Sequence, residues 1–281
     1  MTQAKCANRA ALFDRPAALF LPASRPGAIE KARASDADLC ILDLEDAVKT
    51  EDKDEAREAA IAAVAQDWSM PVGIRMNAPG TRWHAADLTA LSTSAADFLV
   101  VPLVGSAEQV DAVASRAKQP VAAMIETARG VLAADEIGRV AAALIVGTND
   151  LAADLRLPVG AGRGGMRHAI ERVVLAARAC GIAAYDGVYN GLEDDEGFRA
   201  EAAESHALGF DGKTIIHPKH IASCKAAFAP AEADVERARR LIEASGETDG
   251  VGAINFEGEM VEAMHVAAAR RLIERAEQQG E

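Results

Sequence analysis

Short apolar runs rich in branched residues recur along the chain, separated by longer segments in which charged residues appear at helical spacing. Because nearly every position in these runs is apolar, they are typical of parallel strands covered on both faces. The predicted strands cover residues 17–23, 39–46, 72–77, 98–104, 121–127, 142–148, 182–188 and 213–217. The segments between them predict helices, among them residues 51–66, 107–118, 168–181 and 193–209.

Eight alternations of strand and helix over roughly 210 residues match the usual size of a TIM barrel. The predicted fold is therefore α/β, a (β/α)₈ TIM barrel over residues 1–229. A doubly wound open sheet is the alternative, because periodicity does not show whether a sheet closes. Beyond the barrel, residues 231–245 and 261–279 predict two helices around a glycine-bearing segment. We expect residues 230–281 to form a helical extension that packs on the barrel, covers its site as a lid or reaches a neighbouring subunit.

The composition is that of a soluble globular protein, with 50% hydrophobic and 26% charged residues. A net charge of −13 argues against nucleic acid or an anionic membrane as a partner, and no apolar run is long enough to span a membrane. Because Cys6, Cys40, Cys180 and Cys224 are widely spaced, neither a disulfide framework nor a cysteine metal site is predicted. The start of the chain lacks the pattern of a signal peptide, so we expect a cytoplasmic protein.

Polar side chains gather where the predicted strands end, which is the edge of a TIM barrel that carries the chemistry. These residues are Asp43, Glu45, Asp46, Arg75, Glu126, Asp150, Asp186 and His217. Carboxylates crowded at one edge are costly unless protons or a cation neutralise them. A hard divalent ion with oxygen ligands fits best, Mg²⁺ before Ca²⁺ or Zn²⁺, and it leaves positions for a chelating 2-oxo or 2-hydroxy acid.

The three most informative of these residues also have structural interpretations. Glu126 could be a strand-end carboxylate that caps the next helix, and Asp150 could be the N-cap of the helix that follows it. Arg75 could serve only to balance acidic neighbours.

Other residues at the same edge are more often structural. Alternation along a strand places Asp43 and Glu45 on one face and points Asp46 elsewhere or into the loop. A lone histidine such as His217 is more often packed than catalytic. The glycine-rich residues 160–165 lack a Walker lysine and do not follow a strand directly, so they predict a flexible loop rather than a phosphate cradle.

Nine segments spread nearly end to end carry a family resemblance. They read LFLPASRPGAIEKA (19–32), LCILDLEDAV (39–48), IRMNAPGTRW (74–83), VVPLVGSAEQV (100–110), MIETARGV (124–131), VGTNDLAADL (146–155), YDGVYNGLEDDEGF (185–198), GFDGKTIIHPKHI (209–221) and FEGEMVE (256–262). In number, order and strand-end placement they make the chain similar to the citrate lyase β-subunit-like (CitE-like) branch of the HpcH/HpaI aldolase superfamily, the CoA-ester lyases.

This resemblance implies a TIM barrel that assembles into trimers or hexamers. It implies Mg²⁺, with Mn²⁺ as a substitute, held by Glu126 of the ETARG segment and by Asp150. It also implies that Arg75 grips the carboxylate or carbonyl of the substrate, and that Arg25 and Lys31 bind the CoA nucleotide.

Two departures from the family pattern concern the site. Relatives commonly have Glu-Asp where this chain has Asn149-Asp150, which removes one charge beside the second metal ligand. Many CoA-ester lyases carry an aspartate in a lid over the neighbouring subunit's site, and this chain has Glu262 in the corresponding GEMVE segment. The longer side chain leaves open the exact substrate and whether the chain acts as a thioesterase.

The leading hypothesis is a magnesium-dependent carbon–carbon lyase. It would cleave or form a 3-hydroxyacyl-CoA such as malyl-CoA or citramalyl-CoA, with a 2-oxo acid and an acyl-CoA as the other partners. Arg75 would stabilise the developing carbonyl, Glu262 would serve as acid and base, and Glu45 or Asp43 would orient metal-bound water or Arg75. The alternatives are a citrate lyase β-subunit acting on a carrier-bound citryl thioester, a CoA-independent aldolase of 2-oxo acids, and a non-catalytic binding protein.

Overall fold

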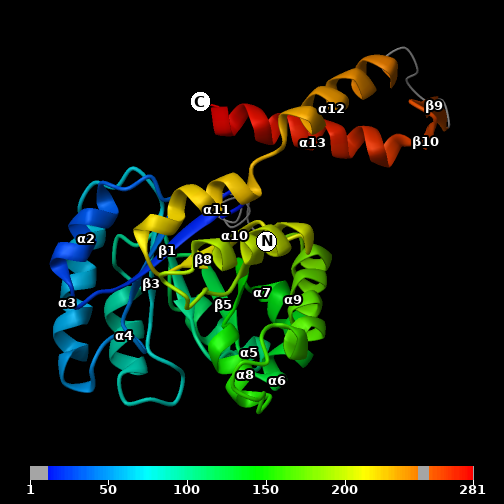
Figure 1. Cartoon of the computed structure of the whole chain (residues 1–281). Coiled ribbons are helices and arrows are strands. Elements are labelled where there is room, and N and C mark those ends of the chain that lie inside the picture. Colours follow the sequence, from blue (N-terminus) through cyan, green and yellow to red (C-terminus); the bar gives the residue numbers. More distant parts are fainter. Residues whose placement is uncertain (1–11, 246–252, 281) are drawn as a thin grey trace. The chain divides into compact units, whose positions relative to one another are not determined.

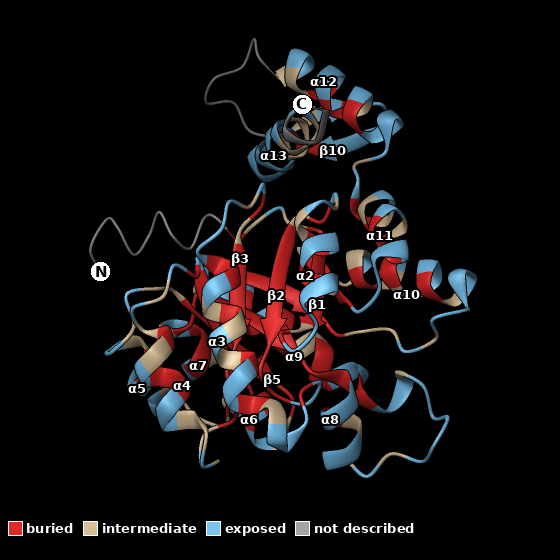
Figure 2. Ribbon diagram, turned by 90° about the vertical axis from the view of Figure 1, so that its left-hand side faces the viewer, coloured by how far each residue is buried: buried red, intermediate tan, exposed pale blue. Residues whose placement is uncertain are grey.

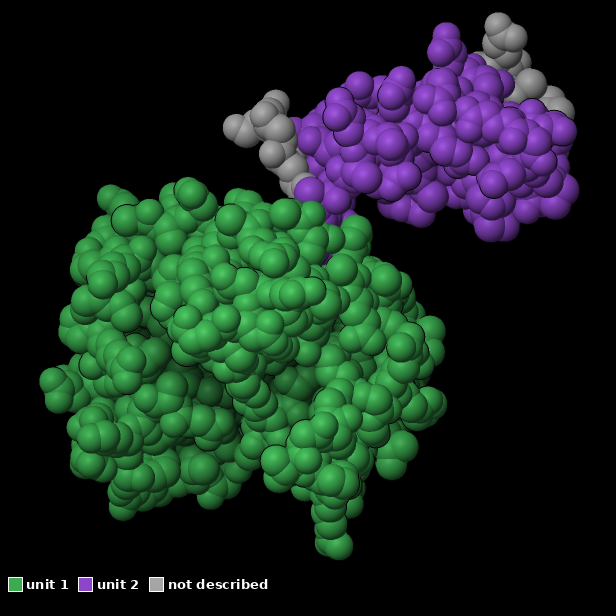
Figure 3. Space-filling model, in the orientation of Figure 1, with its two compact units in different colours: residues 1–227 green, residues 228–281 purple. Residues whose placement is uncertain are grey.

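The computed structural model describes residues 12–245 and 253–280 of the chain (Figure 1). The chain divides into two compact units, Met1–Ala227 and Phe228–Glu281 (Figure 3). The first unit contains the barrel and the second contains the C-terminal helices.

Among the described residues, eight parallel strands close into a barrel in the order in which they occur in the sequence. They are β1 (Ala17–Pro22), β2 (Leu39–Asp43), β3 (Val72–Arg75), β4 (Phe98–Val101), β5 (Val121–Ile125), β6 (Ala143–Val146), β7 (Ala183–Asp186) and β8 (Gly212–Ile215). Closure is completed by β8, which pairs with β1 so that Lys213 lies opposite Ala17. The predicted TIM barrel is therefore confirmed, and the open-sheet alternative is wrong.

Helices surround this barrel, and Figure 2 shows buried strands inside helices that are buried on one face only. They are α2 (Pro26–Arg33), α3 (Lys53–Val64), α4 (His84–Leu91), α5 (Ala107–Ala114), α6 (Ala128–Leu132), α7 (Ala134–Val140), α8 (Thr148–Asp154), α9 (Arg167–Cys180), α10 (Asp195–Ala207) and α11 (Ile221–Phe228). In α9 the buried positions Ile170, Val173, Val174 and Ala177 follow the helical repeat, which explains why it docks along one face.

The strands pair over fewer residues than their apolar runs predict, because hydrophobic sequence continues past the last paired residue. Strand β2 ends at Asp43, whose carboxylate accepts hydrogen bonds from the N–H groups of Glu45 (2.8 Å) and Ala47 (3.1 Å). These bonds turn the chain out of the strand, as aspartate commonly does. Leu44 is nevertheless completely buried, so its hydrophobicity reports burial rather than pairing.

The C-terminal unit has its own small core. It contains α12 (Glu232–Ser245), β9 (Ile254–Phe256), β10 (Glu259–Val261) and α13 (Ala263–Gly280), so both predicted helices are present. A hairpin joins β9 to β10 through Glu257 and Gly258, which both have positive φ, the backbone of a tight two-residue turn. Leu241, Phe256 and Val261 bury their side chains between these elements.

Two predictions about the whole chain can be compared with its described residues. No helix in the two described ranges is long and apolar enough to cross a membrane. Cys40, Cys180 and Cys224 form no disulfide with one another, and Cys6 lies outside the described residues.

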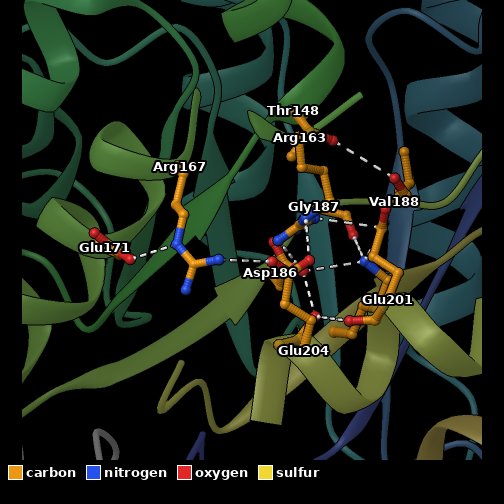
Figure 4. A network of polar contacts seen from close by, with 11 residues as sticks. Thr148, Arg163, Arg167, Glu171, Asp186, Gly187, Val188, Glu201 and Glu204 are labelled. Carbon is orange, nitrogen blue, oxygen red and sulfur yellow. Dashed lines mark hydrogen bonds and ion pairs between the residues drawn. The ribbon is translucent and has the colours of Figure 1, made fainter. Parts of the chain in front are cut away.

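A buried network of charges joins β7 and β8 to α10 (Figure 4). Lys213 on β8 is completely buried, and its Nζ lies 3.1 Å from Asp186 Oδ2 and 2.7 Å from Glu201 Oε1. Arg163 lies 3.0 Å from the same Asp186 oxygen, and Ser205 Oγ also donates a hydrogen bond to it. Burial alone would raise the pKa of Asp186, but the charges of Lys213 and Arg163 outweigh it and lower that pKa.

We expect Lys213→Met to lower the free energy of unfolding by about 3–5 kcal/mol, because it removes the completely buried one of the two cations that pair with Asp186 and Glu201. Lys225→Met is the control. Its ion pair with Asp38 (3.1 Å) is partly exposed, and removal of such a pair costs less than about 1 kcal/mol. Urea denaturation of both variants measures the difference, and equal losses would contradict the prediction.

Candidate functional site

A cavity of about 480 Å³ lies at the C-terminal ends of the barrel strands. Arg25, Arg75, Glu126 and Asp150 all line it, so the structure brings together four of the residues predicted from the sequence. Ligand cavities in TIM barrels form at this end of the strands. The cavity is therefore the candidate active site.

Arg75, the last residue of β3, is held rigidly at the edge of this cavity. Its Nε and Nη2 atoms each lie 2.7 Å from one carboxylate oxygen of Asp43, and its Nη1 lies 2.9 Å from Glu45 Oε2. Burial disfavours the charge of Arg75, but Asp43 and Glu45 outweigh it and raise its pKa. The guanidinium is thus permanently charged, and a bidentate pair fixes its plane.

Glu45 lies just beyond β2 and is buried against Arg75. Burial raises the pKa of Glu45 from 4.5 to about 8, although the charge of Arg75 opposes the shift. The loop that carries it is fixed by Lys53, whose Nζ donates to the carbonyl oxygens of Leu44 (2.8 Å) and Glu45 (2.7 Å). Lys53 was not predicted, because a lysine in the first turn of a surface helix gives no signal of burial.

Glu126 lies directly after β5, and within the described part of the chain only one of its two carboxylate oxygens accepts a hydrogen bond. Oε1 accepts a hydrogen bond of 2.6 Å from the backbone N–H of Leu103, a residue whose positive φ of 50° is unusual for leucine. Oε2 is buried and has no hydrogen-bond partner among the described residues. Burial raises the pKa of Glu126 from 4.5 to about 7.

The space beside Glu126 is kept open by Gly147. A Cβ atom at this glycine would collide with Glu126 Oε2, so any larger residue there would displace the carboxylate. The next helix begins at Thr148 and places Asp150 in its first turn, from where it lines the same cavity. Partial burial and the nearby charge of Asp46 raise the pKa of Asp150.

The two structural interpretations of these acids are wrong. Helix α6 is capped by Thr127, whose side chain accepts from the N–H of Gly130, and not by Glu126. Asp150 lies inside α8, whose N-cap is Gly147, so it is not a cap either.

Glu126 and Asp150 therefore fit a hard divalent cation. A buried carboxylate oxygen without a partner is costly unless something neutralises it. Among residues 12–245 and 253–280, no three or more His, Cys, Asp or Glu side chains gather as a metal site. Two carboxylates are the usual protein share for Mg²⁺, which takes its other ligands from water and substrate.

The positions of two further acidic residues are now defined. Asp46 lies in the loop after β2, which was one of its two predicted places, and it lines the cavity with one oxygen 3.7 Å from Arg75 Nη1. Asp186 contacts Lys213 and the residues of α10 and does not line the cavity.

Lys31 and His217 do not line the cavity, and Glu262 belongs to the other unit. Lys31 is exposed in α2, and His217 is exposed, where its Nδ1 accepts from the N–H of Lys219 (3.2 Å). Glu262 is exposed in the C-terminal unit just before α13, with its N–H donating to His265 Nδ1 (3.0 Å). Its acid–base role stays a prediction.

One pair of cavity residues was not predicted. Asn190 Nδ2 donates to Asn149 Oδ1 at 2.7 Å, and the reciprocal contact is 3.4 Å. Asn149 stands beside Asp150 in the first turn of α8. The pairing joins α8 to the loop after β7, a contact between side chains that the sequence alone does not show.

Comparison with known proteins identifies the family of this chain. Residues 17–218 match the family HpcH/HpaI aldolase/citrate lyase. A (3S)-malyl-CoA thioesterase of Cereibacter sphaeroides is 39% identical over 266 residues, which cover 92% of this chain and 93% of that protein. An L-malyl-CoA/beta-methylmalyl-CoA lyase of the same species is 34% identical over 297 residues, which cover 92% and 93%.

The fold has a solved counterpart. The crystal structure of protein CitE from Mycobacterium tuberculosis in complex with magnesium, acetoacetate and coenzyme A superposes with a TM-score of 0.82 and 37% identity. The match covers 96% of this chain and 100% of that one. The chain belongs to the HpcH/HpaI aldolase/citrate lyase family, and the CitE-like resemblance is confirmed.

The raised pKa of Glu45 predicts a pH-dependent stability. Between its ordinary pKa of 4.5 and about 8, the folded protein binds the Glu45 proton more tightly than the unfolded chain, so the free energy of unfolding falls as pH rises. The slope is at most roughly 1.4 kcal/mol per pH unit. Urea denaturation in metal-free buffer should show this fall in the wild type and a flatter profile in Glu45→Gln. Parallel profiles would refute the assignment.

Proposed function

We propose that this protein is a magnesium-dependent carbon–carbon lyase. It cleaves, or forms in reverse, a 3-hydroxyacyl-CoA such as malyl-CoA or citramalyl-CoA. The observation that carries the proposal is the buried, unpartnered Glu126 Oε2 in the same cavity as Asp150 and the fixed cation Arg75. The malyl-CoA lyase relative and the magnesium and CoA bound to CitE support the choice of reaction and cofactor.

Mg²⁺, with Mn²⁺ as a substitute, is held by Glu126 and Asp150, and when bound it supplies positive charge that holds and polarises the substrate's oxygen atoms. Arg75 stabilises the oxygen that changes from hydroxyl to carbonyl. Asp43 and Glu45 keep Arg75 in place, since they occupy its Nε, Nη1 and Nη2 atoms. The preorganised cation therefore costs no rearrangement during the reaction.

In the cleavage direction, a base removes the proton of the substrate hydroxyl, and that carbon becomes the carbonyl of a 2-oxo acid. The bond to the neighbouring carbon breaks, and its electron pair forms the enolate of the acyl-CoA thioester. A proton then returns to the enolate carbon. We assign this acid–base role to Glu262, contributed by the C-terminal unit of a neighbouring subunit in a cytoplasmic trimer or hexamer.

The CoA nucleotide binds beside β1. Arg25 lines the cavity at the start of α2, and Lys31 stands exposed further along the same helix. Two cations on one helix suit the phosphates of CoA, and the chain's net charge of −13 makes such a local positive segment necessary.

A second candidate is hydrolysis of the malyl-CoA thioester. The Cereibacter sphaeroides relative named (3S)-malyl-CoA thioesterase favours it. Hydrolysis would add water at the thioester carbonyl and release free CoA and malate, whereas cleavage would release acetyl-CoA and glyoxylate. The products therefore separate the two activities.

We expect purified protein with Mg²⁺ to convert malyl-CoA to glyoxylate, or citramalyl-CoA to pyruvate, with acetyl-CoA as the other product. Glu126→Ala and Asp150→Ala should each lower kcat/KM at least 100-fold, because each removes a ligand of the ion. Glu58→Ala, which removes an exposed carboxylate of α3, is the matched control and should retain activity. Chromatography of the acyl-CoA products and a thiol assay for free CoA measure both reactions.

Release of free CoA in place of acetyl-CoA would favour the thioesterase. If folded, magnesium-bound protein neither cleaves nor hydrolyses these esters, the CoA-ester proposal is overturned. A carrier-bound citryl thioester and CoA-free hydroxy-oxo acids are then the substrates to test.

We expect Glu262→Gln to lower kcat by roughly 10²–10⁴-fold with a smaller change in KM, because it removes an acid–base group rather than a binding group. If Glu262 serves a neighbouring subunit, unfolding and refolding a mixture of inactive Arg75→Ala and Glu262→Gln chains will restore part of the activity. In the mixed oligomer, some sites combine an intact Arg75 with an intact Glu262. Unchanged kcat in Glu262→Gln would exclude the role, and absence of rescue would place Glu262 over its own barrel.

A further inference from the structure

A second cavity of about 460 Å³ adjoins the candidate active site. The two cavities share four lining residues, Thr148, Asn149, Val188 and Asn190. Thr148 and Asn149 lie in the first turn of α8, which also carries Asp150, and Val188 and Asn190 lie in the loop after β7. The proposed reaction on malyl-CoA or citramalyl-CoA makes no use of this second space.

The lining of the second cavity is mainly apolar. Beyond the shared residues it includes Ala152 on α8, Leu157 and Pro158 in the loop that follows, and Met166. A volume of about 460 Å³ falls within the range of small-molecule sites and exceeds what the methyl group of pyruvate requires. An apolar space of this kind suits a hydrocarbon chain.

The charged residues of this cavity are already neutralised. Arg163 lies 3.0 Å from Asp186 and 3.3 Å from both Glu201 and Glu204 (Figure 4). Lys213 also pairs with Glu201 at 2.7 Å. A charged ligand group would have to break these buried pairs, so the cavity favours an uncharged one.

The Asn149–Asn190 amide pair lines both cavities. It has one good hydrogen bond of 2.7 Å and one weak contact of 3.4 Å. Both asparagines are exposed, so water would replace the lost hydrogen bonds if the side chains parted. Neither carries a charge that would repel a substrate carboxylate.

We propose that the second cavity is a subsite for the carbon chain of the 2-oxo acid, and that the enzyme accepts unbranched, uncharged 2-oxo acids of five or six carbons. This inference rests on the proposed lyase function. The reacting carbon bears the carboxylate, the oxygen, the bond to the acyl-CoA and one remaining substituent. We place the CoA portion on the Arg25 side, so that the remaining substituent extends past Asn149 once its amide pair with Asn190 has parted.

The test is condensation of acetyl-CoA with pyruvate, 2-oxovalerate and 2-oxohexanoate in the presence of Mg²⁺. In each case the methyl carbon of acetyl-CoA bonds to the keto carbon, and the proton lost from that methyl group is balanced by one gained at the keto oxygen. Mass spectrometry of the 3-hydroxyacyl-CoA products gives kcat/KM for each acid. We expect 2-oxohexanoate to react within tenfold of pyruvate.

Two substitutions with opposite effects locate the subsite. Ala152→Phe fills the cavity and should lower the ratio of kcat/KM for 2-oxohexanoate to that for pyruvate at least tenfold. Leu157→Ala enlarges it and should raise the same ratio at least threefold. Leu175→Ala, which truncates an exposed leucine on α9, is the matched control and should leave the ratio unchanged.

Each outcome of these assays either supports or overturns the assignment of the second cavity as a subsite. Reaction of pyruvate with exclusion of the longer acids would overturn this inference and leave the proposed function standing. Absence of reaction with all three acids would overturn this inference. If glyoxylate, the partner expected for malyl-CoA, also fails to react, the proposed function is overturned as well. If the longer acids react but neither substitution changes the ratio, their chains lie outside the second cavity and the subsite assignment is wrong.

Discussion

The buried pairing of Arg75 with Asp43 organises the active-site edge of this barrel. The bidentate geometry, with both contacts at 2.7 Å, ties the end of β3 to the end of β2. Asp43 also accepts the backbone N–H groups of Glu45 and Ala47, so the same carboxylate turns the chain out of β2. Loss of Arg75 would leave the carboxylate of Asp43 buried without its cation, which is the costly case for internal charges.

Arg75 alone does not balance the acidic side chains around the cavity. Glu45 and Asp46 also face Arg75, while Glu126 and Asp150 lie further round the same cavity. One guanidinium cannot neutralise all of these acids, and burial raises the pKa of Glu126 to about 7. A divalent cation would neutralise two of these carboxylates and would give Glu126 Oε2 a partner.

The barrel could be predicted because its strands are apolar on both faces, which leaves a strong mark in sequence. Several predicted strands extend past the last paired residue, because residues such as Leu44 are buried without pairing. Glu126 and Asp150 could be predicted because function places carboxylates at strand ends. Lys53 could not, because it acts on backbone carbonyls that have no sequence signature. Asp46 lies in the loop after β2, one of its two predicted places, but its approach to Arg75 could not be predicted because strand alternation does not apply beyond the last paired residue.

Asp186 belongs to the buried charge network between β7, β8 and α10, which fixes the loop after β7. A carboxylate at the end of β7 resembles a catalytic group in sequence, yet it pairs with Lys213 and Arg163 instead. Lys213 also donates to the carbonyl of Gly187, the residue before Val188, which lines both cavities. The buried network therefore fixes the loop that forms one wall of the site, and its contribution to function is made through backbone position rather than through contact with substrate.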